Sequence, residues 1–305
     1  MKIAAVVVTY NRIELLKESI QSLRSQTHNF DEIIVINNSS TDGTLNWLQT
    51  QTDLTVITQE NLGSGGGQHT GIKYAYENGY DWIWCMDDDL VVYPNCLQTL
   101  VDFLNKDNLK IGTLQPLKQS DPNGIVHHGA EYIDLNTFSI LDIFDKAKNL
   151  GYFITNSFCF EGVLINTSII KKVGLPRKDF FITNDDREYA MRINSLLPKY
   201  NILLYGEVLM KRINRPGNSH ALLSKLRIIS DWDIRVFYSY FQYFFLSIKL
   251  HKPHMFSKPK AFLFLLRHKV WILKVFLSIL LFHKNKIKKI RLIYNHVLRE
   301  GIFIN

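Results

Sequence analysis

Short apolar runs alternate with amphipathic segments over the first hundred residues of the chain. Runs rich in β-branched residues predict strands at 2–9, 33–36, 54–57 and 82–86. Apolar side chains at helical spacing predict one buried stripe after the first run: Ile13, Leu16, Ile20 and Leu23. Further helices are predicted at 42–49 and 71–80. Alternating strands and helices are typical of βαβ units around a parallel sheet, so a Rossmann-like α/β half is expected here.

The pattern becomes less regular after Asn105. Strands are predicted near 111–115 and 125–133. A helix from about Thr167 to Val173 is expected to end at Gly174. This change of pattern predicts that the second half of the α/β fold contains a mixed sheet rather than a purely parallel one.

The end of the chain is rich in aromatic and basic side chains, and helices are predicted at 230–250 and 259–299. The apolar stretch 261–282 is interrupted by charged or titratable residues: Arg267, His268, Lys269 and Lys274. It therefore lacks the roughly 18 uninterrupted apolar residues of a spanning helix. Two interpretations stay open: the helix lies in an anionic membrane interface, or it packs on the core with a solvated basic face.

Charge also divides the chain. Residues 1–205 hold 17 Lys and Arg against 24 Asp and Glu, a net charge of −7, whereas residues 206–305 hold 19 against 4, or +15. An acidic domain with a basic tail indicates an anionic partner. The acidic first part argues against nucleic acid, so the partner expected for the tail is an anionic membrane surface.

Length and composition exclude several classes of protein. With 305 residues, 46% of them hydrophobic, the chain can bury a large core, which excludes disordered, collagen-like and small disulfide-stabilised proteins. The spacing of Cys85, Cys96 and Cys159 fits neither a disulfide framework nor a metal knuckle, so a reducing compartment is expected. The first residues do not have the pattern of a signal peptide. We therefore expect a cytoplasmic protein, peripheral at the inner face of a membrane.

Three consecutive carboxylates follow the apolar run at 82–86: Asp87, Asp88 and Asp89, here named the aspartate triplet. Open α/β sheets bind ligands at the carboxyl ends of their strands. In an extended segment Asp87 and Asp89 share a face and can hold one hard divalent cation, with Asp88 turned aside. An acidic turn that caps the following helix is the alternative. Three adjacent carboxylates repel one another unless a cation is present, which favours the metal site.

A glycine-rich segment at 61–71 follows the third predicted strand. Glycine permits close approach of the backbone to a ligand and leaves N–H groups for anions. The spacing from Gly63 and Gly65 places Gln68 where a dinucleotide fingerprint needs glycine, and the Gly-Lys-Ser/Thr ending of a phosphate loop is missing. Taken alone, the segment indicates little more than a flexible turn.

A second acidic cluster lies about a hundred residues further on, at Asn184-Asp185-Asp186-Arg187-Glu188-Tyr189. One carboxylate in such a cluster can act as a general base, and another can stabilise the N-terminus of a helix that begins there. Helix capping explains one aspartate, but it does not readily explain two aspartates together with Glu188.

Several separated segments together resemble one family. Val7-Val8-Thr9-Tyr10-Asn11-Arg12, Asn37-Asn38-Ser39-Ser40-Thr41-Asp42-Gly43-Thr44, the glycine-rich segment and Met86-Asp87-Asp88-Asp89 look like an inverting GT-A glycosyltransferase of family 2. Phe160-Glu161-Gly162-Val163-Leu164-Ile165, Gly174-Leu175-Pro176 and Asp185-Asp186-Arg187-Glu188-Tyr189 are similar to the acceptor half of the galactofuranosyl- and rhamnosyltransferase branch. The resemblance is specific from the start of the chain through about residue 220. It implies a GT-A catalytic domain at 1–225, with a nucleotide-sugar half at 1–105 and an acceptor half at 106–225, followed by a helical basic region at 226–305.

The resemblance also implies roles on the donor side. Residues expected around the nucleotide sugar are Thr9, Tyr10, Arg12, Asn38, Gly63, Gly65, Gly66 and Asp88. Many relatives have an acidic residue in the place of Asn38, so uracil and thymine both stay open as the base. Asp87 and Asp89 would bind Mn²⁺ or Mg²⁺, with His220 as the third protein ligand.

On the acceptor side, Asp186 stands in the place of the second Asp of the family's Asp-Asp-x-Glu motif and would be the catalytic base. Residues expected near the acceptor are Trp84, Asp185 and Glu188. The chain departs from its relatives at Phe241-Gln242, where they often have Arg-Asn. A polar contact that relatives supply there is therefore in question for this chain.

The function implied by the resemblance is metal-dependent, inverting transfer of a sugar in a single displacement. The first expectation is galactofuranose from UDP-galactofuranose, with dTDP-rhamnose as the alternative donor and a lipid-linked glycan or polysaccharide as the acceptor. A nucleotidyltransferase would need a basic glycine-rich loop near Thr9, which is missing. A nucleic-acid-binding protein is disfavoured by the acidic first part, and a non-catalytic sugar-nucleotide binding module by the presence of Asp87, Asp89 and Asp186.

Overall fold

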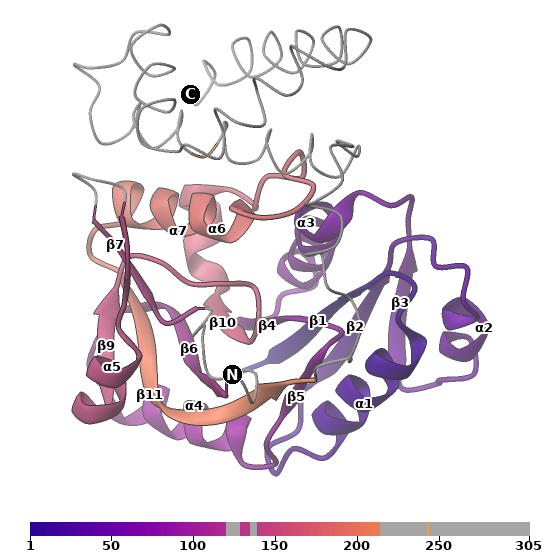
Figure 1. The fold of residues 1–305 in the computed structure, drawn as a ribbon, viewed down its shortest axis with the longest axis horizontal. Coiled ribbons are helices and arrows are strands. Elements are labelled where there is room, and N and C mark those ends of the chain that lie inside the picture. Colours follow the sequence, from indigo (N-terminus) through magenta and orange to yellow (C-terminus); the bar gives the residue numbers. More distant parts are fainter. Residues whose placement is uncertain (120–128, 135–138, 214–242, 244–305) are drawn as a thin grey trace, which may run out of the picture. The chain divides into compact units, whose positions relative to one another are not determined.

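The computed structural model describes residues 1–119, 129–134, 139–213 and 243 (Figure 1). The chain divides into two compact units, one of residues 1–179 and 189–214 and the other of residues 180–188 and 215–305. Several predictions lie outside the described residues: His220, the boundary at 225, Phe241-Gln242 and, apart from residue 243, both C-terminal helices. Among the described residues, no helix combines the length and the hydropathy needed to cross a membrane.

The four predicted N-terminal strands are present and run parallel. β1 (Ile3–Thr9), β2 (Glu32–Asn37), β3 (Leu54–Thr58) and β4 (Trp82–Asp87) lie in the order β3-β2-β1-β4. The predicted helices α1 (Ile13–Arg24) and α2 (Thr44–Leu48) follow β1 and β2. Every residue of β1 is buried, as expected for a central strand of a parallel sheet that is covered on both faces.

The helix α3 (Gly63–Glu77) begins eight residues before the helix predicted at 71–80. The glycine-rich segment therefore forms the first turns of a helix, and the expectation of a flexible turn is wrong. A Cβ atom on Gly67 would lie 2.4 Å from Val8 Cγ1, and one on Gly71 would lie 2.2 Å from Val6 Cγ1. Glycine disfavours helix, but here its lack of a side chain lets α3 approach β1 closely.

The second half completes a mixed sheet, as predicted. Its elements are β5 (Leu90–Val92), α4 (Cys96–Lys106), β6 (Ile111–Gln119), β7 (Glu131–Asp134), β8 (Ser139–Asp142), α5 (Phe144–Leu150), β9 (Tyr152–Thr155), β10 (Val163–Asn166), a 3₁₀ turn (Thr167–Ile169), α6 (Ile170–Val173), α7 (Asp185–Leu196) and β11 (Asn201–Arg212). β10 lies antiparallel between β4 and β6, and β11 lies parallel to β6 and antiparallel to β5 and β9. β7 and β8 form a separate two-stranded sheet. The sequence patterns do not predict α4, α5, β5 or the strands β8 to β11.

The main sheet separates two hydrophobic cores, because successive side chains of a strand point to opposite faces. One set of β1 residues, Ile3, Ala5 and Val7, packs with α1 and α4. The alternate set, Ala4, Val6 and Val8, packs with α3 and with residues 189–193 of α7. Figure 1 shows α1 and α3 on either side of the strands. Because β1, β4, β6 and β11 run in the same direction, their carboxyl ends lie at one edge of the sheet.

Candidate active site

The loops that follow β1 and β2 are tied to one another. Asn11 adopts a left-handed backbone conformation with a φ of 54°, and its side-chain oxygen accepts a hydrogen bond from Thr41 N at 2.7 Å. The Asp42 carboxylate accepts hydrogen bonds from Ile13 N at 3.0 Å and from the Thr44 hydroxyl at 2.5 Å. Asp42 therefore caps the starts of both α1 and α2, which orders the chain beside the end of β1.

Asn38 is buried, and its side-chain amide forms hydrogen bonds with other groups of the protein. The amide donates to the carbonyl oxygen of Gly63 at 3.0 Å and accepts from Gln59 Nε2 at 2.8 Å. Gln59 in turn accepts a hydrogen bond from the Thr70 hydroxyl at 2.7 Å. This chain of neutral groups fixes the first turns of α3 to the end of β2.

The aspartate triplet does not continue β4, which ends at Asp87; Asp88 and Asp89 form a turn before β5. The Asp88 carboxylate is buried and accepts hydrogen bonds from the Thr9 hydroxyl at 2.7 Å and from Arg12 Nη1 at 3.1 Å. Arg12 Nη1 also lies 3.4 Å from Asp89 Oδ2. The expected extended arrangement, in which Asp88 turns aside from the other two, is therefore wrong: a turn brings Asp88 and Asp89 to one arginine.

The end of β11 holds Asp89. Arg212 pairs with Leu90 in the ladder between β11 and β5, and Ile213 N donates to the Asp89 carbonyl oxygen at 2.7 Å. Arg212 Nε lies 3.3 Å from Asp89 Oδ2, an ion pair that lacks hydrogen-bond geometry. The second carboxylate oxygen, Asp89 Oδ1, is buried and has no hydrogen-bond partner in the described part of the chain.

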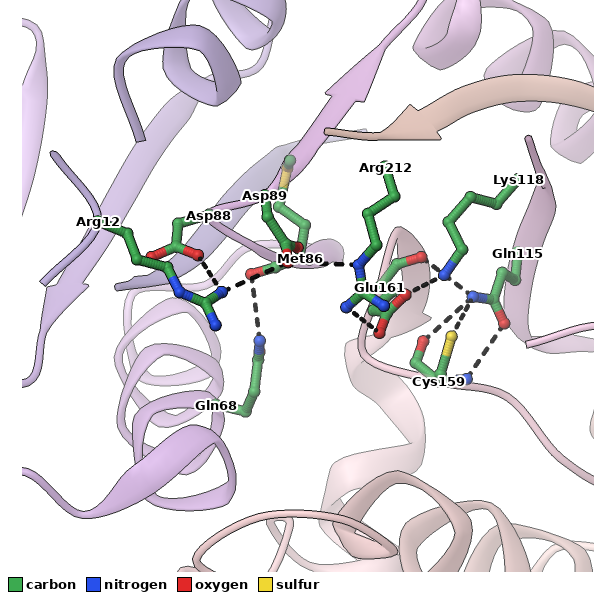
Figure 2. A network of polar contacts seen from close by, with 10 residues as sticks. All are labelled: Arg12, Gln68, Met86, Asp88, Asp89, Gln115, Lys118, Cys159, Glu161 and Arg212. Atoms are coloured by element: carbon green, nitrogen blue, oxygen red, sulfur yellow. Dashed lines mark hydrogen bonds and ion pairs between the residues drawn. The ribbon is translucent and has the colours of Figure 1, made fainter. Parts of the chain in front are cut away.

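Glu161 and Lys118 extend this network of charges (Figure 2). The antiparallel register of β10 and β4, continued beyond Val163, places Glu161 at the level of Asp87. Glu161 Oε1 accepts a hydrogen bond from Arg212 Nη2 at 2.9 Å, and Glu161 Oε2 contacts Nζ of the buried Lys118. The carboxylate of Glu161 thus connects two cations that come from β6 and β11.

Gln115 on β6 positions the segment that carries Glu161. Its side-chain amide donates to the carbonyl oxygens of Cys159 and Glu161 at 3.2 and 3.1 Å, and it accepts from Cys159 N at 3.2 Å. Gln115 is buried, so this recognition of the backbone takes place away from water. The position of Glu161 is therefore set by the backbone as well as by ion pairs.

Carboxylate groups outnumber cationic groups in this network. Four carboxylates, Asp87, Asp88, Asp89 and Glu161, meet three cations, Arg12, Lys118 and Arg212. Burial, followed by the charges of Glu161 and Asp89, raises the pKa of Asp87 well above its usual value. Burial also raises the pKa of Asp88 to about 6, although the charge of Arg12 opposes this shift. In the described part of the chain, Asp88, Asp89 and Glu161 each form an ion pair with at least one of these cations, whereas Asp87 forms none with them.

The donor set at this edge fits a hard divalent cation. Carboxylate oxygens are ligands that Mg²⁺ and Mn²⁺ prefer, and Asp89 Oδ1 is a buried oxygen without a hydrogen-bond partner among the described residues. Over residues 1–119, 129–134 and 139–213, no three His, Cys, Asp or Glu side chains form a metal-binding cluster. Asp87 and Asp89 therefore fit as part of a ligand set, while the predicted third ligand, His220, lies outside the described residues.

The second acidic cluster lies at the start of α7, and its residues 184–188 belong to the other compact unit. Thr183 and Asn184 both have a φ of 62°, a strained conformation that is concentrated at functional sites. Asp185 and Glu188 are buried, whereas Asp186 is half-buried. Burial, followed by the charge of Asp186, raises the pKa of Asp185 to about 8. Of these three acids, Asp186 is the one whose surface remains partly accessible.

Most predicted donor residues of the first unit lie at the same edge of the sheet. The structure brings together Thr9, Arg12, Asp87, Asp88 and Asp89. Tyr10 follows Thr9 and has 45% of its surface exposed. At the start of α3, the predicted glycines are buried: Gly63, Gly65 and Gly66.

The prediction that Trp84 contacts the acceptor is wrong. Its side chain is 1% exposed, packs edge-on against Phe30 with ring centroids 6.2 Å apart, and donates from Nε1 to Met86 Sδ at 3.3 Å. β4 is a central strand that is covered on both faces, so the alternation of its side chains leaves Trp84 in the core.

The sequence prediction assigns no role to Lys118, Glu161 or Arg212. One signal was available for Lys118, because a lysine that continues an apolar strand is rarely buried unless it is paired. Arg212 carries no comparable signal, since its place depends on the pairing of β11 with the short strand β5.

Comparison with known proteins identifies the family. The profile of "Glycosyl transferase family 2" matches residues 4–174, which is more than half of the chain. The protein therefore belongs to glycosyl transferase family 2. The membership predicted from the separated motifs, and with it the glycosyltransferase class, is confirmed.

Curated relatives include transferases for two different sugars. A galactofuranosyltransferase of Mycolicibacterium smegmatis is 28% identical over 63% of this chain and 65% of its own length. An O-antigen chain rhamnosyltransferase of Salmonella anatum is 26% identical over 50% of each chain. The chain thus spans slightly less than two thirds of the length of the galactofuranosyltransferase.

Solved structures share the fold. The structure of S. aureus TarS 1-349 in complex with UDP aligns with a TM-score of 0.56 and 15% identity over 88% of this chain and 70% of that chain. A mannosyltransferase from Pyrobaculum calidifontis in complex with GDP-Man and Mn²⁺ aligns with a TM-score of 0.55 and 18% identity over 99% of this chain and 86% of that chain. The predicted GT-A fold is confirmed.

Proposed function

We propose that the protein is a metal-dependent, inverting glycosyltransferase that moves a sugar from a UDP- or dTDP-sugar to a hydroxyl group of a lipid-linked glycan or polysaccharide. The aspartate triplet carries the proposal, because it lies at the carboxyl edge of the sheet where carboxylates exceed their cations. A divalent cation together with a nucleoside diphosphate complements such an edge. Relatives solved with UDP, or with GDP-Man and Mn²⁺, support this class of donor.

The first donor we propose is UDP-galactofuranose. It is supported by the galactofuranosyltransferases of Mycolicibacterium smegmatis and Mycobacterium tuberculosis, each 28% identical to this chain over more than 60% of its length. The rhamnosyltransferase of Salmonella anatum supports dTDP-rhamnose as the second candidate. Both donors contain a nucleoside diphosphate, so the donor side of the site must bind the same diphosphate group in either case.

On the donor side, the exposed ring of Tyr10 would stack on the nucleobase. Thr9 and Arg12 would order Asp88, which would contact the sugar or ribose. Asn38 would act through its hydrogen bond to Gly63, which fixes the start of α3. The first-turn N–H groups there, including those of Gly65 and Gly66, are suited to an anionic diphosphate.

Asp186 is the proposed catalytic base. It would accept the acceptor's hydroxyl proton while that oxygen attacks the anomeric carbon and the bond to the diphosphate breaks, so that configuration inverts. A bound Mn²⁺ or Mg²⁺ supplies charge neutralisation for the leaving diphosphate. Asp87 and Asp89 would hold this ion, with His220 as a further ligand. The buried Asp185 and Glu188 would shape the acceptor side.

The test is a panel of UDP- and dTDP-sugars assayed for hydrolysis and transfer, with Mn²⁺ or Mg²⁺ and with EDTA. We expect turnover of one donor, lost with EDTA and in Asp186→Asn and Asp89→Ala. Asp53→Asn is a matched control, because Asp53 is an exposed carboxylate that pairs with Arg24. Absence of nucleotide binding in the presence of metal would contradict the assignment of Asp87 and Asp89.

The proposed location is cytoplasmic and peripheral at the inner face of a membrane. The support is the net charge of +15 on residues 206–305, since each basic residue near an anionic surface contributes about 1 kcal/mol. We expect the full chain to sediment with anionic vesicles at low salt and to be released at high salt. If it stays in the supernatant at low salt, the membrane proposal is wrong.

A further inference from the structure

The position of the Arg212 backbone is set by the pairing of β11 with β5. It lies opposite Leu90 in the β11–β5 ladder, and the next residue, Ile213, donates its N–H to the carbonyl oxygen of Asp89 at 2.7 Å. The strand end therefore places the backbone of Arg212 beside the aspartate triplet, and its side-chain contacts with Glu161 and Asp89 then position the guanidinium group. Arg212 is only 31% exposed, so its charge acts on its neighbours with limited screening by water.

The two anionic partners of Arg212 hold it differently. Glu161 accepts a hydrogen bond from Nη2 at 2.9 Å, and Lys118 anchors the same carboxylate from its other oxygen. Asp89 lies 3.3 Å from Nε without hydrogen-bond geometry. Figure 2 shows Arg212 between these two carboxylates. Arg212 is thus fastened to Glu161 and only loosely paired with Asp89, so Asp89 can change partner while Arg212 stays in place.

The charges around Asp89 add up to a small excess of negative charge. The four carboxylates Asp87, Asp88, Asp89 and Glu161 and the three cations Arg12, Lys118 and Arg212 leave a net charge of −1 when all are ionised. A divalent cation that arrives alone would turn this into a net positive charge. A cation that arrives with an anionic diphosphate would not, because the ligand brings its own negative charge.

We propose that Arg212 is a built-in counter-cation of Asp89 that keeps divalent metal from binding strongly by itself and makes metal binding depend on the nucleoside diphosphate. Glu161 and Lys118 are positioning residues that hold Arg212 for this purpose. The inference rests on the proposed metal-dependent function and adds to it a coupling between the binding of metal and the binding of the nucleotide. By thermodynamic linkage, metal and UDP must raise each other's affinity by the same factor.

The proposal is tested by measuring Mn²⁺ binding, for example by electron paramagnetic resonance of the free ion, without UDP and with saturating UDP. Arg212→Met removes the counter-cation, so Mn²⁺ alone should bind about tenfold more tightly, and UDP should enhance its binding less than in the wild type. Arg212→Lys keeps the charge and should bind Mn²⁺ within a few-fold of the wild type. Arg24→Met is the matched control, because it removes the charge of an arginine that pairs with Asp53.

A second variant guards against simple damage to the fold. Glu161→Gln removes a negative charge and leaves Arg212 with Asp89, so Mn²⁺ alone should bind more weakly, opposite to Arg212→Met. Equal or weaker Mn²⁺ binding by Arg212→Met, with a wild-type unfolding temperature, would overturn the role of Arg212 alone. Failure of the wild type to bind Mn²⁺ even with UDP would overturn the metal assignment itself, and this inference with it.

Discussion

Replacing Gly71 by alanine tests the close packing of α3 on β1. The new Cβ atom would lie 2.2 Å from Val6 Cγ1 and 3.3 Å from Ile36 Cγ1. Carbon atoms in contact prefer a separation of about 3.5 to 4.0 Å, so the helix and the strand must move apart by more than about 1 Å. Val6 and Ile36 are completely buried, which leaves no solvent-filled space for this movement.

Two opposing terms set the magnitude. Alanine in place of glycine within a helix favours folding by up to about 1 kcal/mol. Overpacking of a tight core costs about 1 to 3 kcal/mol. We therefore expect the free energy of unfolding to fall by about 1 to 2 kcal/mol, whereas an unobstructed helical glycine would show an increase.

Urea denaturation followed by circular dichroism measures this change, and a double-mutant cycle with Val6→Ala identifies its cause. Val6→Ala removes Cγ1, so the double variant should be more stable than the sum of the single effects predicts, by about 1 kcal/mol or more. Lys73→Ala, at an exposed position of the same helix, should change stability by less than about 0.5 kcal/mol. Stabilisation by Gly71→Ala, or additive effects in the cycle, would refute the packing argument.

Three further predictions concern single side chains. Asp42→Ala removes caps from α1 and α2 and should lower the free energy of unfolding by about 1 to 2 kcal/mol in urea denaturation. Burial alone would raise the pKa of Asp42, but the hydrogen bonds from Thr44 and Ile13 outweigh burial, so the folded pKa is lowered. The contribution of Asp42 to stability is therefore present above the unfolded pKa of 3.8 and is lost as the pH falls from there through the lower folded pKa. Thermal unfolding at pH 6 and pH 3 should therefore differ less for Asp42→Ala than for the wild type; an equal difference contradicts this assignment. Tyr10→Ala should raise the KM for the donor about tenfold with little change in unfolding temperature, because its ring is exposed, and Tyr10→Phe should retain donor binding; an unchanged KM in Tyr10→Ala argues against stacking. Lys118→Met breaks a buried ion pair and should destabilise the fold by about 3 kcal/mol, as measured in urea; a loss below about 1 kcal/mol would show that Arg212 alone suffices for Glu161.

The parts of the fold that depend on local pattern could be predicted from the sequence. The strands at 3–9, 32–37, 54–58 and 82–87 are fully or largely apolar runs, and α1 has one regular apolar stripe, so periodicity alone identifies them. The start of α3 could not be predicted, because glycine has a poor helix propensity and the reason for Gly67 and Gly71 is contact with another element. Tertiary packing overrides propensity there.

The candidate site divides in the same way. Thr9, Arg12 and the aspartate triplet lie at the ends of two adjacent parallel strands. Their proximity follows from the predicted Rossmann-like half, because the first and fourth strands are neighbours in that strand order. The prediction for Trp84 is wrong because both sets of alternating side chains are buried in a strand that is covered on both faces. In such a strand, a large aromatic residue is better explained by core packing than by contact with a ligand.

The remaining charged residues depend on one topological feature, the insertion of β10 in the opposite direction between β4 and β6. An antiparallel strand presents its amino end at the edge where its neighbours present their carboxyl ends. Glu161 precedes β10 and therefore reaches Asp87, which ends β4, although 74 residues separate them in the sequence. Lys118 and Arg212 then reach Glu161 because β6 and β11 run in the direction of β4. A carboxylate and two cations thus join the aspartate triplet through strand order, which no local motif encodes.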